Sequence, residues 1–509
     1  MPPKPTLYLA PSGADAGVLA AGIAGLCEGR VEPVRRERRT LLDTFDWRVH
    51  RGGLAFEHIT SGDGAHLVLR AWGQAPPLAT LPTDDGAPRL ATELAPGRVR
   101  EKLAPLLDVR ALVAIAAYDV AVHLVVVRND DDKAVARIAV DDMGAGHVVI
   151  RCLPVTGYVR AAKAAVRAVT ASRCQEAGID VSDVALERAG RRAGDRGGKL
   201  ALAFDGTSSA ASGWVTALVA LLDEIEANID GTVADIDSEF LHDLRVAVRR
   251  SRSALRHAHD VLPAELLDCF RPALRWLQEI TGPARDLDVY VLAAEADLAT
   301  LDAAARPALE PFQRFLAGRR VEAHERLNAD LRSPACEAVL ADWRHTLLSL
   351  GAPEGGEEAG EWGAWPEQAE RNLAEVAAHR IRAEHRKLVR DGEAIEDASP
   401  ATALHDLRKR GKELRYLLEL FGQLLDRRRT DSFVKALKGL QDVLGEFQDT
   451  EVQIRALRGW ADELAASGNT GAPTVMAMGE LVERLQQRQD SAREAFAARF
   501  ARFAAAERP

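Results

Sequence analysis

The strongest constraint on the fold of this chain is a segment that occurs twice. LHDLR stands at 241–245 and again at 404–408, and LQEITGPARDLDV from Leu277 aligns without a gap to LQDVLGEFQDTEV from Leu440 at the same offset. Both segments carry apolar residues at helical spacing, and the distance between them is the same in each copy. Chance similarity between helices rich in Ala and Leu does not explain a shared distance, so we expect a duplicated helical domain.

The repeat occupies the C-terminal part of a chain of 509 residues, which is longer than one hydrophobic core supports. The N-terminal part instead shows short β-branched runs separated by turn clusters, which is typical of an antiparallel sheet. We therefore expect an α+β domain at 1–190, a linker at 191–211 and an all-α domain at 212–509. The two halves of the all-α domain are predicted at about 212–350 and 367–509.

Each copy of the repeat places basic side chains along one side of a helix. At 100° per residue, the basic residues that follow the histidine of HDLR lie within a stripe about 80° wide. Leu and Val residues border this stripe directly, whereas an ordinary solvated face lies opposite the apolar side. The stripe is therefore expected to line a groove or a channel between helices. Its members are His242, Arg245, Arg249, Arg252 and Arg256 in the first copy, and His405, Arg408, Lys412 and Arg415 in the second.

A third set of basic residues lies on the helix that precedes the second copy, where His379, Arg382 and Arg386 follow the same spacing. The second copy also departs from the first at its last position, because Glu419 stands at the angle of Arg256. Like charges at helical spacing weaken an isolated helix by roughly a few tenths of a kcal/mol per pair. Each stripe therefore needs a partner that offsets the repulsion.

Two kinds of partner fit the stripes. In the first interpretation they form ion pairs within the protein, with Asp286, Asp288, Asp449 and Glu451 as candidates. In the second they bind an extended polyanion, since a stripe covers roughly 21 Å at 1.5 Å per residue and arginine grips phosphate with a planar fork. Proteins that bind single-stranded nucleic acid usually interleave aromatic residues with basic ones. Tyr416 is the only aromatic residue within either stripe, which favours a ligand of phosphates without bases.

Composition narrows the remaining classes. The net charge of −10 argues against a chain that coats anionic surfaces as a whole, although acidic residues concentrate away from the stripes, as at 354–361. The five cysteines include no CxxC pair, so neither a disulfide framework nor a zinc site is expected and a cytoplasmic location is the default. The longest apolar window, 111–127, includes Asp119 and His123 and is too short to span a bilayer, so we expect no membrane partner.

The two stripe segments and the LQ segments that follow them resemble the CHAD family, the conserved histidine α-helical domain. The resemblance covers about residues 212–509 and includes both halves. It implies two pseudo-twofold-related helical bundles that bind inorganic polyphosphate through basic residues in a central cleft, and some members associate with polyphosphate granules. Carried over by position, it implicates the stripe residues and adds Arg275 and Lys438, which are related by the offset of the repeat.

The N-terminal part resembles the CYTH family, through LLDTFDWRVHRGGLAFEH at 41–58 and CLPVTGYVRAA at 152–162. That resemblance implies an antiparallel β tunnel in which inward Arg and Lys hold a triphosphate and inward Glu holds a divalent metal. Members carry an ExExK strand near the N-terminus. Here that strand reads TLYLA, with Thr6, Tyr8 and Ala10 at the positions expected to point inward.

A second acidic strand is also altered, because Ile150 and Arg151 stand where Glu is expected. The resemblance therefore implies a degenerate tunnel without triphosphatase activity. The basic residues that remain as candidate phosphate contacts are Arg36, Arg38, Arg70 and Arg137.

Together these features predict a non-enzymatic protein that binds inorganic polyphosphate in a basic cleft, without a cofactor, in the cytoplasm or on polyphosphate granules. One alternative is a metal-dependent inorganic triphosphatase in which Glu57 or Asp141 replaces the missing ligands. A second alternative is a helical module that binds nucleic acid, which the shortage of aromatic residues makes the weaker choice. Whether the chain forms a homo-oligomer is left open.

Overall fold

The chain forms two compact units, Met1–Lys199 and Leu200–Pro509, and each is described by itself. The computed structural model describes the backbone of residues 7–83, 86–178, 180–195, 200, 202, 204, 207–300, 306–351, 362–468 and 471–507, with side chains for all of these except 295–300 and 351. Predicted contacts of Thr6 therefore lie outside the described residues.

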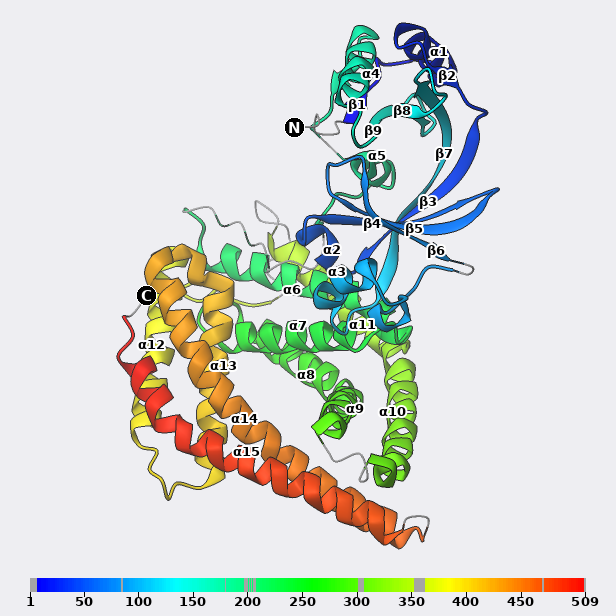
Figure 1. Ribbon diagram of the computed structural model, residues 1–509. Helices are drawn as coiled ribbons and strands as arrows, with labels where there is room; N and C mark the ends of the chain where they lie inside the picture. Colours follow the sequence, from blue (N-terminus) through cyan, green and yellow to red (C-terminus); the bar gives the residue numbers. More distant parts are fainter. Residues whose placement is uncertain are drawn as a thin grey trace. The chain divides into compact units, whose positions relative to one another are not determined.

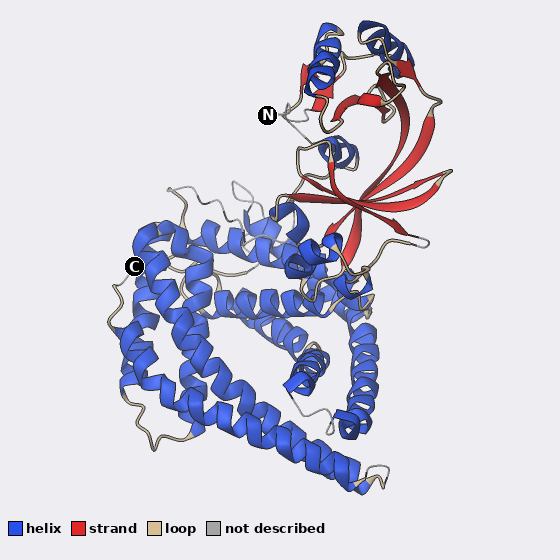
Figure 2. Ribbon diagram, in the orientation of Figure 1, coloured by secondary structure: helices blue, strands red, loops and turns tan. Residues whose placement is uncertain are grey.

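The first unit is built on one antiparallel sheet that curls into a half-barrel (Figures 1 and 2). The sheet runs in the order β10-β1-β9-β8-β7-β3-β4-β5-β6, and β2 pairs with β7. Among the described residues no pairing joins β6 to β10, so the sheet is open. The strands are β1 (Leu7–Leu9), β2 (Arg30–Val31), β3 (Arg35–Thr44), β4 (Leu54–Ser61), β5 (Gly64–Ala71), β6 (Pro77–Thr83), β7 (Leu112–Arg128), β8 (Ala134–Asp142), β9 (Val148–Pro154) and β10 (Gln175–Glu176).

Helices cover both faces of this sheet. On the convex face, α1 (Ala16–Leu26) and α4 (Val159–Ala171) pack through small apolar residues against β7, β8 and β9. On the concave face lies α5 (Val181–Arg188), whose Val and Ala residues pack against β7, β8 and β9 from the other side. Two further helices, α2 (Arg48–Arg51) and α3 (Arg98–Leu107), and a 3-10 turn at Ala91–Glu93 close the end formed by β3–β6. The α+β class predicted for this part is confirmed.

The side chains of β1 point opposite to the prediction. Leu7 and Leu9 pack with the α5 side of the sheet, whereas Tyr8 and Ala10 pack with α1 and α4 on the convex face. Alternation along a strand is strict, so the error is a shift of one residue in the register, which the pairing of Leu7 with Arg151 fixes. The concave side thus receives leucine from this strand, which supplies neither a metal ligand nor a phosphate contact.

The second unit is entirely helical in its described part, as predicted (Figure 2). Its helices are α6 (Ala210–Val233), α7 (Ser238–Arg256), α8 (Ala264–Ile280), α9 (Gly282–Thr300), α10 (Glu310–Leu331), α11 (Pro334–Gly351), α12 (Leu373–Glu393), α13 (Ala401–Phe421), α14 (Arg427–Ala466) and α15 (Ala472–Ala504), with 3-10 turns at Arg306–Leu309 and Gly422–Leu424. Among the described helices none is both long and apolar enough to cross a membrane.

Helix positions reproduce the repeat. Three helices of the first half begin at residues that the repeat aligns with the first residues of helices in the second half. These pairs of first residues are Ala210 and Leu373, Ser238 and Ala401, and Ala264 and Arg427. The two halves share one apolar core rather than two separate ones, since Trp214 of α6 packs on Phe421 of α13 with ring centroids 4.4 Å apart. The α6 backbone approaches α12 so closely that a Cβ at Gly213 would overlap Leu373.

The halves differ at one break. In the first half α8 ends at Ile280 and α9 begins at Gly282, whereas α14 runs through the equivalent region without interruption. Pro283 follows the break and cannot donate a backbone hydrogen bond, which explains why the helix stops there. The equivalent residue of α14 is Glu446, which continues the helix.

Candidate functional site

The two basic stripes lie on α7 and α13, which pack against each other within the helical unit. The N-terminus of α7 is fixed by Asp237, whose carboxylate accepts backbone hydrogen bonds at 2.9 Å from Glu239 and 3.2 Å from Phe240. Apolar residues such as Leu244 and Leu407 anchor each helix in the shared core. The stripes therefore border the core, as the helical angles predicted.

Arg245 of the first stripe donates to neutral groups. Its Nη1 atom lies 3.0 Å from both the carbonyl oxygen of Gln278 and the hydroxyl of Thr281, at the end of α8. The break between α8 and α9 is what frees this carbonyl. Burial, the charge of Arg249 and that of Arg285 lower the pKa of Arg245 to about 10, although Asp286 opposes the shift. In the described part of the chain the guanidinium is thus held among cations without an ion-pair partner of its own.

The equivalent residues of the second stripe bind the uninterrupted helix α14. His405 Nδ1 lies 2.5 Å from Gln448 Oε1, and Arg408 Nη2 donates to Asp449 Oδ1 at 2.9 Å. Lys412 is half-buried one turn further along α13. Burial and the charges of Arg408 and Arg249 lower the pKa of Lys412 to about 8.

Arg249 and Lys412 bring the two stripes together. The charge of Arg249 on α7 contributes to the lowered pKa of Lys412 on α13, so the two side chains lie close to each other across the junction. The Nε atom of Arg249 is buried, and it has no hydrogen-bond partner among the described residues. A buried donor without a partner is costly. The centre of the two stripes is therefore a crowded, incompletely compensated group of cations.

The far ends of the stripes are compensated by glutamates. Arg256 forms an ion pair with Glu413 at 2.8 Å, and Arg415 forms one with Glu419 at 2.7 Å. Arg252 donates to the side-chain oxygen of Gln278. The surplus of positive charge is thus concentrated in the middle of α7 and α13, around Arg249 and Lys412.

Of the four acidic residues predicted as partners of the stripes, two lie near stripe residues and two are paired with other cations. Asp449 pairs with Arg408, and Asp286 lies close enough to Arg245 to influence its pKa. Asp288 instead pairs with Arg320 at 2.7 Å and with His324 at 3.0 Å, and Glu451 pairs with Arg455 at 3.1 Å. The prediction that Asp288 and Glu451 could form ion pairs with the stripes is wrong. Asp288 is paired with residues of α10, and Glu451 is paired with a residue of its own helix, α14.

The remaining predicted residues lie around this centre in different ways. His242 is half-buried at the start of the stripe on α7. Arg275 on α8 is exposed and close enough to Arg252 to lower its pKa, after burial and the charge of Arg256. Lys438 is exposed on α14. The three basic residues of α12, which are His379, Arg382 and Arg386, are all exposed, and in the described residues no hydrogen bond or ion pair connects them to either stripe.

Sequence reasoning did not select Arg285, which is half-buried at the start of α9. Its Nη1 atom donates to the carbonyl oxygen of Ser238 at 2.9 Å. Burial lowers the pKa of Arg285, with the charge of Arg249 adding to the effect and Glu239 opposing it. Arg285 lies in the ARDLD segment of the first copy, and the equivalent residue of the second copy is Gln448. Because the two copies do not share a cation at this position, the repeat alone does not point to Arg285.

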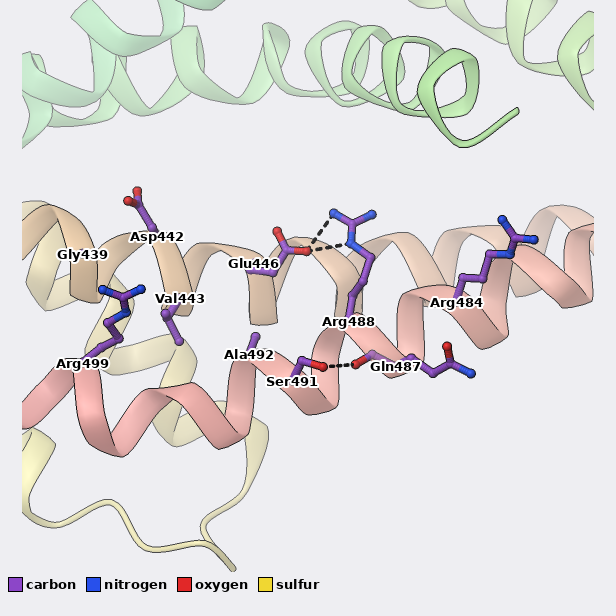
Figure 3. Close-up of a pocket in the computed structure, with 10 residues that line it drawn as sticks. All are labelled: Gly439, Asp442, Val443, Glu446, Arg484, Gln487, Arg488, Ser491, Ala492 and Arg499. Carbon is purple, nitrogen blue, oxygen red and sulfur yellow. Dashed lines mark hydrogen bonds and ion pairs between the residues drawn. The ribbon is translucent and has the colours of Figure 1, made fainter. Parts of the chain in front are cut away.

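A separate groove lies between α14 and α15 (Figure 3). It has a volume of about 630 Å³, and Arg484, Arg488 and Arg499 extend along one side of it. Two of these arginines are paired, Arg484 with Glu480 at 2.6 Å and Arg488 with Glu446 at 2.7 Å. The groove therefore has mixed charge, unlike the centre of the stripes.

The concave side of the N-terminal sheet holds buried ion pairs instead of an open tunnel. Arg70 donates to Glu57 at 3.0 Å and to Asp180 at the start of α5, so it is not available to a phosphate as predicted. Arg39, which sequence reasoning missed, lies 2.7 Å from Glu37 and 3.0 Å from Asp141. The other three candidate arginines are not buried in this way. Arg36 and Arg38 line a separate cavity of about 790 Å³, and Arg137 is exposed.

These carboxylates do not suit a divalent metal. Burial raises the pKa of Glu57, but the charges of Arg70 and Arg39 outweigh it and hold the pKa at about 2. The same balance, with Arg151 and Arg39 as the cations, holds the pKa of Asp141 at about 2. Glu57 is already paired with Arg70, and Asp141 is paired with both Arg39 and Arg151. Among the described residues no group of three or more His, Cys, Asp or Glu side chains is arranged to hold a metal ion.

The helical unit is thus an internally duplicated all-α domain with a pair of basic stripes at the junction of its halves. Residues 216–458 match the family model described as the CHAD domain. The matched residues lie within the helical unit and include both stripes. No curated protein matches the chain at a significant level.

Solved structures resemble parts of the chain. The CHAD domain from the plant Ricinus communis is 24% identical, covers 59% of this chain and 94% of its own, and has a TM-score of 0.49. PptA from Streptomyces chartreusis is 19% identical, covers 58% and 100%, and has a TM-score of 0.43. The adenylyl cyclase HpAC1 from Hippeastrum, described as having a dominant triphosphatase activity, is 12% identical, covers 37% and 95%, and has a TM-score of 0.29. All three scores are below 0.5, and none supports a conclusion about function.

Proposed function

We propose that this protein binds inorganic polyphosphate through the basic groups of α7 and α13, without chemical turnover, and that it acts in the cytoplasm or on polyphosphate granules. The observation that carries the proposal is the meeting of two repeat-related stripes at Arg249 and Lys412, where half-buried cations lack matching acids among the described residues. Desolvated cations held together repel one another until an anion binds between them. A chain of phosphates supplies negative charge at closely spaced intervals and fits an extended track.

A nucleic-acid ligand is supported less well by the same site. Stacking of bases needs exposed aromatic rings beside the cations. Tyr416 is buried in the core, so it offers no such surface. The phosphate chain without bases remains the better fit, and RNA at equal phosphate concentration is expected to compete poorly with long-chain polyphosphate.

The enzymatic alternative rests on the N-terminal unit. A triphosphatase needs carboxylates free to hold a divalent cation, yet Glu57 and Asp141 are each bound to arginines. We expect no phosphate release from tripolyphosphate in the presence of Mg²⁺ or Mn²⁺. Release that disappears on chelation would support the alternative.

A direct test replaces four stripe residues, Arg245, Arg249, Arg408 and Lys412, with alanine in the full chain. Polyphosphate affinity is expected to fall by at least about 100-fold, because charged hydrogen bonds contribute roughly 1.5–3 kcal/mol each. The salt dependence of binding should also flatten as fewer counterions are released, by analogy with nucleic acid.

The matched control removes four exposed arginines that each pair with a glutamate four residues away in the sequence, namely Arg314, Arg326, Arg371 and Arg455. Both variants change the net charge by the same amount. Equal loss of affinity in the two variants would place the binding surface elsewhere.

A further inference from the structure

Two ion pairs join α7 to α13, and the repeat relates one to the other. Arg250 Nη2 lies 2.6 Å from Glu419 Oε2, and Arg256 Nη1 lies 2.8 Å from Glu413 Oε1. In the alignment of the two copies, Arg250 corresponds to Glu413 and Arg256 corresponds to Glu419. The two ion pairs therefore occupy equivalent positions: exchanging the two halves places the second pair where the first one lies.

This arrangement is charge-complementary only between unlike halves. The first half supplies both arginines, and the second half supplies both glutamates. Two copies of the first half in the same arrangement would oppose arginine to arginine, and two copies of the second would oppose glutamate to glutamate. Such unfavourable pairings give specificity to an interface.

The pairs lie beside the centre of the stripes and are partly shielded from water. Arg250 and Glu419 keep 25% and 27% of their side-chain surface exposed, whereas Arg256 keeps 61% and only its partner Glu413, at 18%, is shielded. Glu413 also accepts a hydrogen bond from the hydroxyl of Ser253 at 2.5 Å and lies 3.4 Å from His257 Nε2. Partial burial strengthens electrostatic attraction relative to an exposed pair.

We propose that Arg250, Arg256, Glu413 and Glu419 are positioning residues that fix α7 against α13 and hold Arg249 beside Lys412. The inference rests on the proposed function, because the groups being positioned are those proposed to bind polyphosphate. Arg249 and Lys412 repel each other across the junction, and the two ion pairs attract across the same junction. Arg256 then acts through Glu413 rather than by contact with phosphate.

The fold should tolerate loss of these pairs. The halves also meet in the shared core at Trp214 and Phe421 and at a second junction, where Phe312 of α10 packs with Leu457 of α14 and Leu481 of α15. Variants at the ion pairs are therefore expected to fold, and any change in affinity reports on local geometry.

A double-mutant cycle on the full chain tests the proposal, with long-chain polyphosphate as the probe. Arg250→Glu and Glu419→Arg are each expected to weaken binding by about tenfold, since coupled charge pairs are worth roughly 0.5–3 kcal/mol. The combination of both should recover most of the lost affinity, because the ion pair between positions 250 and 419 is restored in the opposite sense, while Arg415 still lacks its pairing with Glu419. Glu419→Arg is the sharpest member, since added positive charge alone would strengthen the binding of a polyanion.

The control cycle uses Arg319 and Glu463, an ion pair that joins the halves at the second junction. Its single variants are expected to change affinity only as their net charge dictates. If Glu419→Arg binds more tightly than the wild type, or if the double variant stays as weak as the single ones while folded, the positioning role is wrong. If the wild-type chain itself does not bind polyphosphate, the proposed function fails and not this inference alone.

Discussion

Lys412 offers the most direct prediction, because its charge is held at a cost to the fold. Burial and the neighbouring charges of Arg408 and Arg249 lower the pKa of Lys412 from 10.5 to about 8. At about 1.36 kcal/mol per pKa unit, the charged form costs the folded protein up to about 3 kcal/mol, and partial exposure reduces this to about 1–3 kcal/mol. Lys412→Met keeps the length of the side chain and removes the charge.

The variant is expected to be more stable than the wild type at pH 7. Because the pKa of Lys412 is lower in the folded than in the unfolded chain, the wild type gains stability as pH rises from about 8 to 10.5. Below pH 8 the full cost of the charge is present. Scanning calorimetry should show a higher melting temperature for Lys412→Met at pH 7 and a smaller difference between the proteins near pH 10.

Binding should change in the opposite direction. A bound polyphosphate raises the pKa of Lys412, so wild-type affinity is expected to be greatest below pH 8 and to fall as pH rises above it. Loss of one charged contact should weaken binding at pH 7 by about 10-fold to 100-fold. The variant should also lose the part of the pH dependence that begins near pH 8.

A matched control comes from the same helix. Lys409 is exposed and pairs with Asp406 at 3.2 Å, so Lys409→Met should change neither stability nor affinity appreciably. If Lys412→Met bound polyphosphate as tightly as the wild type, or unfolded at a lower temperature at pH 7, the view of Lys412 as a strained binding group would be wrong.

Three further predictions follow from other contacts. Asp449→Asn releases Arg408 from its ion pair and should strengthen polyphosphate binding by several-fold in titration calorimetry, whereas Glu451→Gln should have little effect, because Glu451 pairs with Arg455. Arg70→Met leaves buried Glu57 and Asp180 without their cation and should destabilise the N-terminal unit by about 3–5 kcal/mol in denaturant unfolding. Gly231→Ala places a methyl group against the ring of Phe240 and should cost about 1–3 kcal/mol, measured by thermal unfolding.

The sequence predicted the helical unit well because the relevant signals are local and occur twice. Apolar spacing locates helices, and a fixed offset identifies equivalent ones, so the first residues of α7 and α13 agree with the repeat. The side of each helix that carries the stripe also follows from spacing alone. No tertiary information is needed for these steps.

Partners of charged residues were less predictable, because they depend on helices far apart in the sequence. Asp288 lies in the segment that follows the first stripe, yet its carboxylate forms ion pairs with Arg320 and His324 of α10 and not with the stripe. Arg250 and Glu419 pair across 169 positions. The reversed charges at equivalent positions were visible in the aligned repeats, and they were the available signal for the ion pairs at the junction.

The N-terminal sheet shows how a single register decides a site. A shift of one residue in β1 exchanges Tyr8 for Leu7 on the concave face, and short strands carry too few residues to settle that choice. The position of α5 on the concave side was equally difficult to predict from the sequence, because it depends on a contact between Asp180 and Arg70, which lie 110 positions apart.

The break between α8 and α9 makes the two halves electrically unlike, although their helices occupy equivalent positions. In the first half the break offers Arg245 a neutral carbonyl, and in the second the intact α14 offers Arg408 a carboxylate. Arg245 is therefore held by neutral groups with Asp286 nearby, whereas Arg408 is held in an ion pair. A phosphate chain has no inherent direction, but a chain bound as proposed along both stripes would meet an arginine held by neutral groups on α7 and an ion-paired arginine on α13.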